Sequence, residues 1–141
     1  KDVWFSWHTG SVKVAQGDLF KQPRTIQMIL THPKSQTLTE LAKVVNLSAP
    51  QMASDIEALT DAVKKKGASI LWFDGPVANS IIIADPEQPS GWARIEVLLP
   101  FGDPASRPSI KVLASHAPDL FARIKKAFIQ LKEQSQEQNG K

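Results

Sequence analysis

Apolar and polar positions follow two different rhythms along the chain. Apolar residues that recur every three or four positions predict a helix, and those that alternate predict a strand. The helical spacing covers residues 24–31, 37–46, 48–67 and 118–134. The strand pattern covers residues 68–74, 79–85, 92–101 and 109–115. It also covers an aromatic stretch at 3–14, which we expect to be a β-hairpin around a Thr-Gly turn.

The two middle helices have recognisable end signals. Thr37 and Glu40 are spaced as a capping box, in which a hydroxyl accepts from the third backbone N–H while the carboxylate reaches back. Ser48 and Gln51 repeat this spacing eleven residues later. Asn46 lies between the two helices, where a residue that tolerates the left-handed conformation is needed. These signals predict two helices separated by a tight break.

Two capped helices joined by about three residues form a helix-turn-helix unit, with the small Ala42 near the crossing point. The strands 68–74 and 79–85 follow directly, and we expect them to pair as a hairpin, or wing. The stretch NLSAPQMASDIEAL, residues 46–59, resembles the recognition segment of winged helix-turn-helix regulators of the LysR, MarR and biotin-repressor types. The resemblance covers residues 24–85.

The resemblance implies a fold class and a division of the chain. The fold class is α+β, with a winged helix-turn-helix core at residues 24–85. An N-terminal β-hairpin arm at 1–23 precedes the core. A C-terminal β-β-α extension at 86–141 follows it, for which we expect a role in dimerisation or sensing.

The same resemblance implies DNA contacts, because the second helix of such a unit enters the major groove. The resemblance assigns groove, backbone and wing contacts to Thr39, Lys43, Ser48, Ala49, Gln51, Ser54, Asp55, Asn79 and Ser80. The triplet at the end of the second helix, Lys64, Lys65 and Lys66, has two interpretations: a solvated terminus that compensates the helix dipole, or a set of phosphate contacts. We therefore expect a module that binds double-stranded DNA by inserting helix 48–61 into the major groove. Such a module would be a transcriptional regulator, or a domain of a replication, partition or DNA-processing factor.

Charge weakens this interpretation at one point. The whole chain has a net charge of +3, a mild excess that suits a polyanionic partner. However, the helix that should read DNA has no cation before Lys64, and it presents the acids Asp55 and Glu57. Such a helix would lack the arginines that usually contact guanine and phosphate. The alternative is a winged-helix domain that binds a protein partner within a larger assembly, and a homodimer is a further expectation.

Other chemistry is poorly represented. The chain has no cysteine, and its three histidines lie in separate segments, so we expect no metal, no cofactor and no enzymatic activity. No apolar run approaches the ~18 residues that a membrane helix needs, so we expect no membrane partner. The absence of cysteine fits a cytoplasmic protein, which is the expected compartment. The basic amphipathic helix 118–134 has two interpretations: it packs against the strands, or it binds a membrane surface or a partner.

Overall fold

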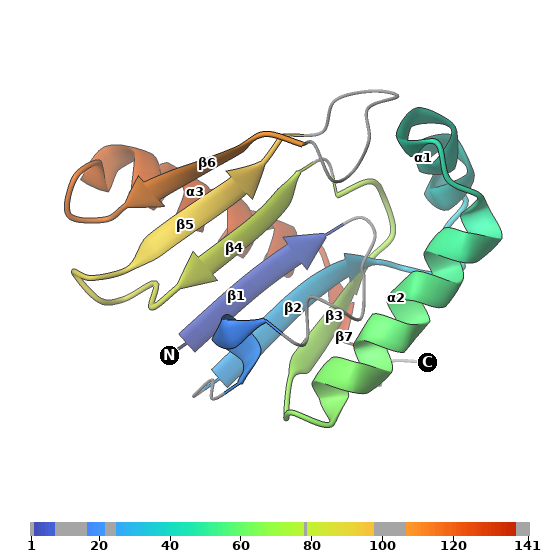
Figure 1. Ribbon diagram of the computed structural model, residues 1–141, viewed down its shortest axis with the longest axis horizontal. Helices are drawn as coiled ribbons and strands as arrows, with labels where there is room; N and C mark the ends of the chain where they lie inside the picture. The colour runs from blue at the N-terminus through green and yellow to red at the C-terminus, as the bar shows by residue number, and fades with distance from the viewer. Residues whose placement is uncertain (1, 8–16, 22–24, 78, 98–106, 138–141) are drawn as a thin grey trace.

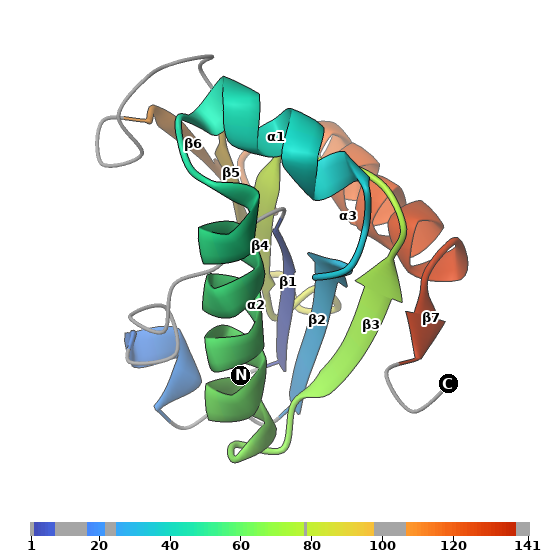
Figure 2. The same cartoon turned by 90° about the vertical axis from the view of Figure 1, so that its right-hand side faces the viewer.

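The structure is a computed structural model that describes residues 2–7, 17–21, 25–77, 79–97 and 107–137. Its strands are β1 (Asp2–Trp7), β2 (Thr25–Thr31), β3 (Ser69–Phe73), β4 (Ser80–Ala84), β5 (Trp92–Glu96), β6 (Ser109–Leu113) and β7 (Gln136–Glu137). Its helices are η2 (Asp18–Phe20), α1 (Thr37–Val45), α2 (Ala49–Lys64) and α3 (Pro118–Glu133). These elements form one sheet with helices on both faces (Figures 1 and 2).

The seven strands lie in the order β6-β5-β4-β1-β2-β3-β7. β1, β2 and β3 are parallel to one another and form one half of the sheet. β4, β5 and β6 form an antiparallel meander beside β1, and the short β7 pairs antiparallel with β3 at the other edge. The sheet is therefore mixed, and β1 is the strand at which its parallel and antiparallel halves meet.

The winged helix-turn-helix fold class is wrong, because the two strands expected to form the wing are not neighbours. β3 pairs with β2 and β7, whereas β4 pairs with β1 and β5. The chain after β3 crosses the ends of the intervening strands, where Thr31 Oγ1 donates to the Gly75 carbonyl oxygen at 3.1 Å. Two strands close in sequence favour a hairpin, but in this fold the partners of each strand come from elsewhere.

The stretch 24–31 is also not a helix. Residues 25–31 form β2, which is paired on both sides and buried on both faces. Met28 and Leu30 face the α1–α2 layer, whereas Ile29 faces α3. A central parallel strand is apolar almost continuously, so its sequence also contains the spacing of a short helix.

The two capped helices form the layer on one face. Ser48 caps α2 and its side chain accepts from Gln51 N at 3.1 Å, and Asn46 takes the left-handed conformation with φ 57°, as predicted. The capping box at Thr37 is wrong, because the residue before α1 is Gln36 and Glu40 instead pairs with Lys43. The inner sides of both helices pack on the parallel half of the sheet through buried residues: Leu38, Ala42, Val45, Met52, Ile56, Leu59 and Val63.

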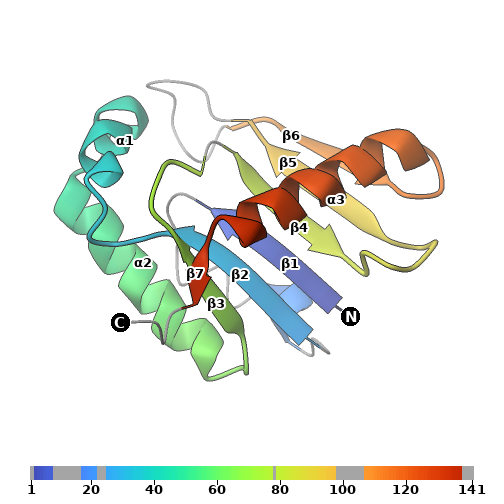
Figure 3. The ribbon, with the colours of Figure 1, turned by 180° about the vertical axis from the view of Figure 1, so that it is seen from behind.

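The C-terminal helix α3 covers the opposite face of the sheet (Figure 3). Phe121, Ile124 and Phe128 point inward and are buried against strand residues that include Ile83 and Ala93. The amphipathic pattern at 118–134 thus marks a helix that packs against strands. The hairpin expected at 3–14 is wrong, because its first strand is β1, whose two neighbours in the sheet are β2 and β4. The remainder of that stretch lies outside the described residues.

The connection between β4 and β5 is tightly closed at Gly91. Its N–H donates to the Gln88 carbonyl at 2.9 Å, and its own carbonyl accepts from Ala114 N at 2.9 Å. A Cβ at this position would overlap the Asp85 carbonyl oxygen and would lie 3.0 Å from that of Gln88. Backbone atoms are in the way, so a larger residue requires the turn itself to shift.

We therefore expect Gly91→Ala to lower the free energy of unfolding by about 1–3 kcal/mol. The measurement is urea unfolding followed by tryptophan fluorescence. Ser90→Ala is the control, because Ser90 is exposed and its change should stay within about 0.5 kcal/mol. Equal unfolding midpoints for the two variants would contradict this packing of the turn.

Candidate ligand-binding site

The residues predicted to contact DNA do not form one cluster. Ser48 and Gln51 lie at the start of α2 and Lys64 at its end, about 24 Å apart at the helical rise. Ser80 is the first residue of β4 and its side chain is buried, whereas Asn79 is exposed and precedes the strand. The remaining positions lie on exposed surface of α1, α2 and the turn after α2: Thr39, Lys43, Ser54, Lys65 and Lys66.

Several of these predicted DNA contacts already have partners within the chain. Lys43 pairs with Glu40 at 3.1 Å, and Gln51 Nε2 donates to Asp55 Oδ1 at 2.8 Å. Lys66 Nζ donates to the Phe20 carbonyl oxygen at 2.9 Å. No contact with DNA is tested by this geometry, so duplex DNA binding stays a prediction, now without the wing that supported it.

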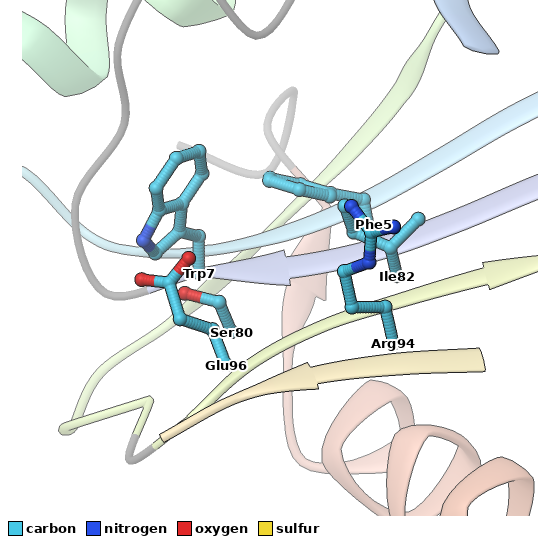
Figure 4. A pocket seen from close by; sticks show the side chains of 6 residues that line it. All are labelled: Phe5, Trp7, Ser80, Ile82, Arg94 and Glu96. Atoms are coloured by element: carbon cyan, nitrogen blue, oxygen red, sulfur yellow. The ribbon is translucent and has the colours of Figure 1, made fainter. Parts of the chain in front are cut away.

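A pocket lies where the two halves of the sheet meet, at the carboxyl end of β1 (Figure 4). It encloses about 190 Å³. Six side chains line it: Phe5, Trp7, Ser80, Ile82, Arg94 and Glu96. Small-molecule sites typically enclose about 300–1,000 Å³ and have an apolar lining with a few polar groups. The pocket has such a lining but is smaller, so it suits a small ligand or one group of a larger ligand.

Strand alternation places these six residues on one face. Each of the three strands β1, β4 and β5 contributes two side chains that are two positions apart. The ladders align Phe5 with Ile82 and Ile82 with Arg94, and they align Ser80 with Glu96. Phe5 and Ile82 therefore form an apolar base at one end, and Trp7, Ser80 and Glu96 gather at the other (Figure 4).

This face is the one that α1 and α2 cover, but their cover ends near β1. Both helices pack mainly against β1, β2 and β3, and in the described part of the chain no helix lies over β5 and β6 on this side (Figures 1 and 2). Trp92 and Lys111 share this open face with Arg94, and Lys111 Nζ lies 4.7 Å from the centre of the Trp92 ring. The pocket therefore lies between a covered and an uncovered region of the sheet.

Two side chains that line this pocket carry a buried polar atom without a hydrogen-bond partner. These atoms are Trp7 Nε1 and Ser80 Oγ. The other such atoms in the described residues are Ser6 Oγ, on the opposite face of the sheet, and Nε and Nη2 of Arg107, which is not part of the lining. Each such atom costs about 1–3 kcal/mol when it stays unpaired, so two of them in one pocket wall require an explanation.

The charge around the pocket is mainly positive. Glu96 lines it and accepts from Arg107 Nη1 at 3.3 Å. Arg94 is the cation of the lining, and Lys111 lies opposite Arg94 in the ladder between β5 and β6. Among the lining side chains one carboxylate, Glu96, is balanced by one guanidinium, Arg94, and Arg107 and Lys111 are cations outside the lining. The two unpaired lining atoms, Trp7 Nε1 and the Ser80 hydroxyl, can both donate, which favours a ligand with hydrogen-bond acceptors.

Sequence reasoning found only Ser80 among the pocket residues, and assigned it to a wing. Arg94 and Glu96 carried a usable signal, because the alternation in 92–101 places both on the same side of a strand. Nothing in the sequence pattern shows that β5 lies two strands from β1. Trp7 was recognised as part of an aromatic stretch, but its position at the end of β1 depends on where that strand stops.

Alternative chemistry is less well supported in the described residues. His32 lies with Glu57, Asp61 and Trp72 in a shallow hollow, and its Nδ1 accepts from Lys34 N at 3.0 Å. No group of three or more His, Asp or Glu side chains in the described ranges could hold a metal ion. None of the helices in those ranges is both long and apolar enough to span a bilayer.

A comparison of the chain with models of protein families, with characterised proteins and with solved structures finds no match.

Proposed function

We propose that the chain is a ligand-binding domain whose pocket at the carboxyl end of β1 takes a small organic molecule. The observation that carries this proposal is the buried, unpartnered Ser80 hydroxyl in the pocket wall, next to the unpartnered Trp7 Nε1. A ligand with one or more acceptor oxygens would pair both groups. Its apolar part would lie against Phe5 and Ile82.

The topology supports this position for a binding site. In open sheets with parallel strands, ligands often bind near the carboxyl ends of the strands, where chain connections diverge to opposite sides. The pocket differs in lying on one face, but its Trp7 end is beside the carboxyl end of the parallel strand β1. β1 is followed in the chain by β2 on one side, and β4 returns to its other side. The pocket lies at this point, because the start of β4 is beside the end of β1.

The chemistry of the pocket supports binding rather than catalysis. A serine nucleophile needs an adjacent base within hydrogen-bond reach. Ser80 Oγ has no hydrogen-bond partner, and no histidine lines the pocket in the described residues. The domain would then act as a sensing or recruiting module.

The test compares Ser80→Ala with Ser6→Ala. Both serines are buried and have unpaired hydroxyls, but they lie on opposite faces of the sheet. Each substitution removes an unsatisfied polar group, so each should stabilise the ligand-free protein, by about 1 kcal/mol. Only Ser80→Ala should weaken ligand binding, by about fivefold or more.

Ligands are found by ligand-observed NMR with a collection of small organic acids, phosphate esters, alcohols and amides at millimolar concentration. The Kd of each hit is then measured for the wild type and for both variants. The proposal would be rejected if no compound bound, or if the two alanine variants changed the Kd equally.

A further inference from the structure

Two cations lie directly opposite each other on the sheet face that α1 and α2 leave open. The antiparallel ladder between β5 and β6 pairs Arg94 with Lys111, and both residues are exposed. In the described part of the chain no helix covers this side of the two strands (Figure 1). Like charges directly opposite one another destabilise a sheet, so this pair costs the fold free energy.

No carboxylate among the described residues compensates these two charges. Neither Arg94 nor Lys111 forms an ion pair there, and Glu96, two positions after Arg94, is bonded to Arg107. Both cations lie over the ring of Trp92, at 4.7 Å from its centre for Lys111 Nζ and 6.0 Å for Arg94 Cζ. A ring attracts cations through its negative face but carries no net charge, so both positive charges can still attract an anion.

The aromatic and apolar groups of this face lie beside its cations. Trp92 is half-buried, and Leu113, which is opposite Trp92 in the ladder, is 37% exposed. Single-stranded nucleic acids are bound by this combination of groups. Their bases stack on aromatic rings or on guanidinium planes, and their phosphates contact cations.

We propose that Trp92, Arg94, Lys111 and Leu113, here called the basic face, bind single-stranded nucleic acid. Phosphates lie against Arg94 and Lys111, which relieves the repulsion between the two cations. A phosphate attracts an ammonium more strongly than a ring does, so Lys111 moves off the Trp92 ring and a base stacks there. This inference goes beyond the proposed function, because Lys111 is not part of the pocket lining.

Two other polyanionic partners match the basic face less well. The bases of a duplex are stacked on one another, so a duplex can use the two cations but not the ring. An anionic bilayer would use the cations and an apolar group that projects past them. Trp92 is half-buried beneath Arg94 and Lys111 and does not project in this way.

The first test measures the fluorescence anisotropy of a labelled oligothymidylate at about 50 mM salt with the wild type, Lys111→Glu and Lys126→Glu. Lys126 is the matched control, because it is exposed on α3 and α3 covers the opposite face of the sheet. We expect Lys111→Glu to raise the Kd at least about tenfold and Lys126→Glu to raise it about twofold or less. Lys111→Glu should also raise the midpoint of urea unfolding, because a carboxylate then lies opposite Arg94.

Stacking is tested on the wild type with an abasic strand of the same length, which keeps the phosphates and lacks the bases. The abasic strand should bind at least about fivefold more weakly than oligothymidylate, and so should the corresponding duplex. Trp92→Leu keeps an apolar side chain and removes the ring. If it folds, it should bind the normal and abasic strands alike, and the wild-type comparison stands without it.

Equal binding of the single strand, the abasic strand and the duplex would overturn the inference, because only phosphate contacts would then remain. Equal losses in Lys111→Glu and Lys126→Glu would also overturn it, as would the absence of binding by any strand. Vesicles of phosphatidylglycerol and phosphatidylcholine that bound while no strand did would assign the basic face to a membrane surface instead. None of these results affects the pocket, whose test is Ser80→Ala with small organic ligands.

Discussion

Phe128→Ala is expected to lower the free energy of unfolding by about 3–5 kcal/mol. The Phe128 side chain is 1% exposed and its ring stacks on Trp4 with centroids 5.2 Å apart. Alanine would leave a cavity between α3 and the sheet that neither rigid element can fill. The loss is a large share of the 5–15 kcal/mol that stabilises a typical domain.

Urea unfolding monitored by circular dichroism gives the size of this effect, and the emission of Trp4 should shift toward that of a solvated indole. Leu120→Ala is the matched control on the same helix, because Leu120 is 47% exposed and its loss should cost about 1 kcal/mol or less. Similar midpoints for the two variants would mean that α3 does not pack on the sheet through Phe128.

Met28→Ala is expected to lower the free energy of unfolding by about 2–5 kcal/mol. The size of this change distinguishes a strand from a helix at residues 25–31. In β2, Met28 is fully buried beneath the α1–α2 layer. In a helix over the same residues, Ile26, Ile29 and Leu30 would form the inner side, and Met28 would face away from it. If residues 25–31 formed that helix, Met28→Ala would lower the free energy of unfolding by only a few tenths of a kcal/mol.

The control for Met28→Ala is Gln27→Ala in the same strand. Gln27 is half-buried on the α3 side and accepts a hydrogen bond from Lys132 Nζ at 2.8 Å. Its removal should cost about 1 kcal/mol or less, because this bond is exposed to solvent. The measurement is again the midpoint of urea unfolding, and a Met28→Ala midpoint within error of that of Gln27→Ala would refute the buried strand.

Local signals in the sequence were sufficient for the helices that have clear ends. Ser48 begins α2 by accepting a hydrogen bond from Gln51 N, and Asn46 ends α1 by taking the left-handed conformation. Both effects act within a few residues of the chain. The spacing of Phe121, Ile124 and Phe128 likewise describes one side of one helix. Such features can be predicted because the interactions that produce them are close in sequence.

Pairing between strands could not be predicted in the same way. The stretches that form β3 and β4 have the composition of a hairpin, but β3 pairs with β2 and β4 pairs with β1. The alternation of apolar and polar residues within a strand does not identify the strand that pairs with it. The pocket depends on these distant pairings, since Trp7, Ser80 and Glu96 meet only when β1, β4 and β5 lie side by side. The resemblance at residues 46–59 described one capped helix, α2, and the turn before it, and extended them to a fold that the strands do not form.

The position of β1 in the middle of the sheet has a consequence for how the chain folds. Its ladder with β4 joins the beginning of the chain to residues about eighty positions later, and Asp2 N bonds Asp85 Oδ1 across 83 positions. Closing so long a loop costs entropy before any of the sheet's central contacts form, so proteins rich in such contacts fold slowly. During synthesis, β1 and β2 would emerge long before β4, with one side of β1 still open to pairing with another nascent chain.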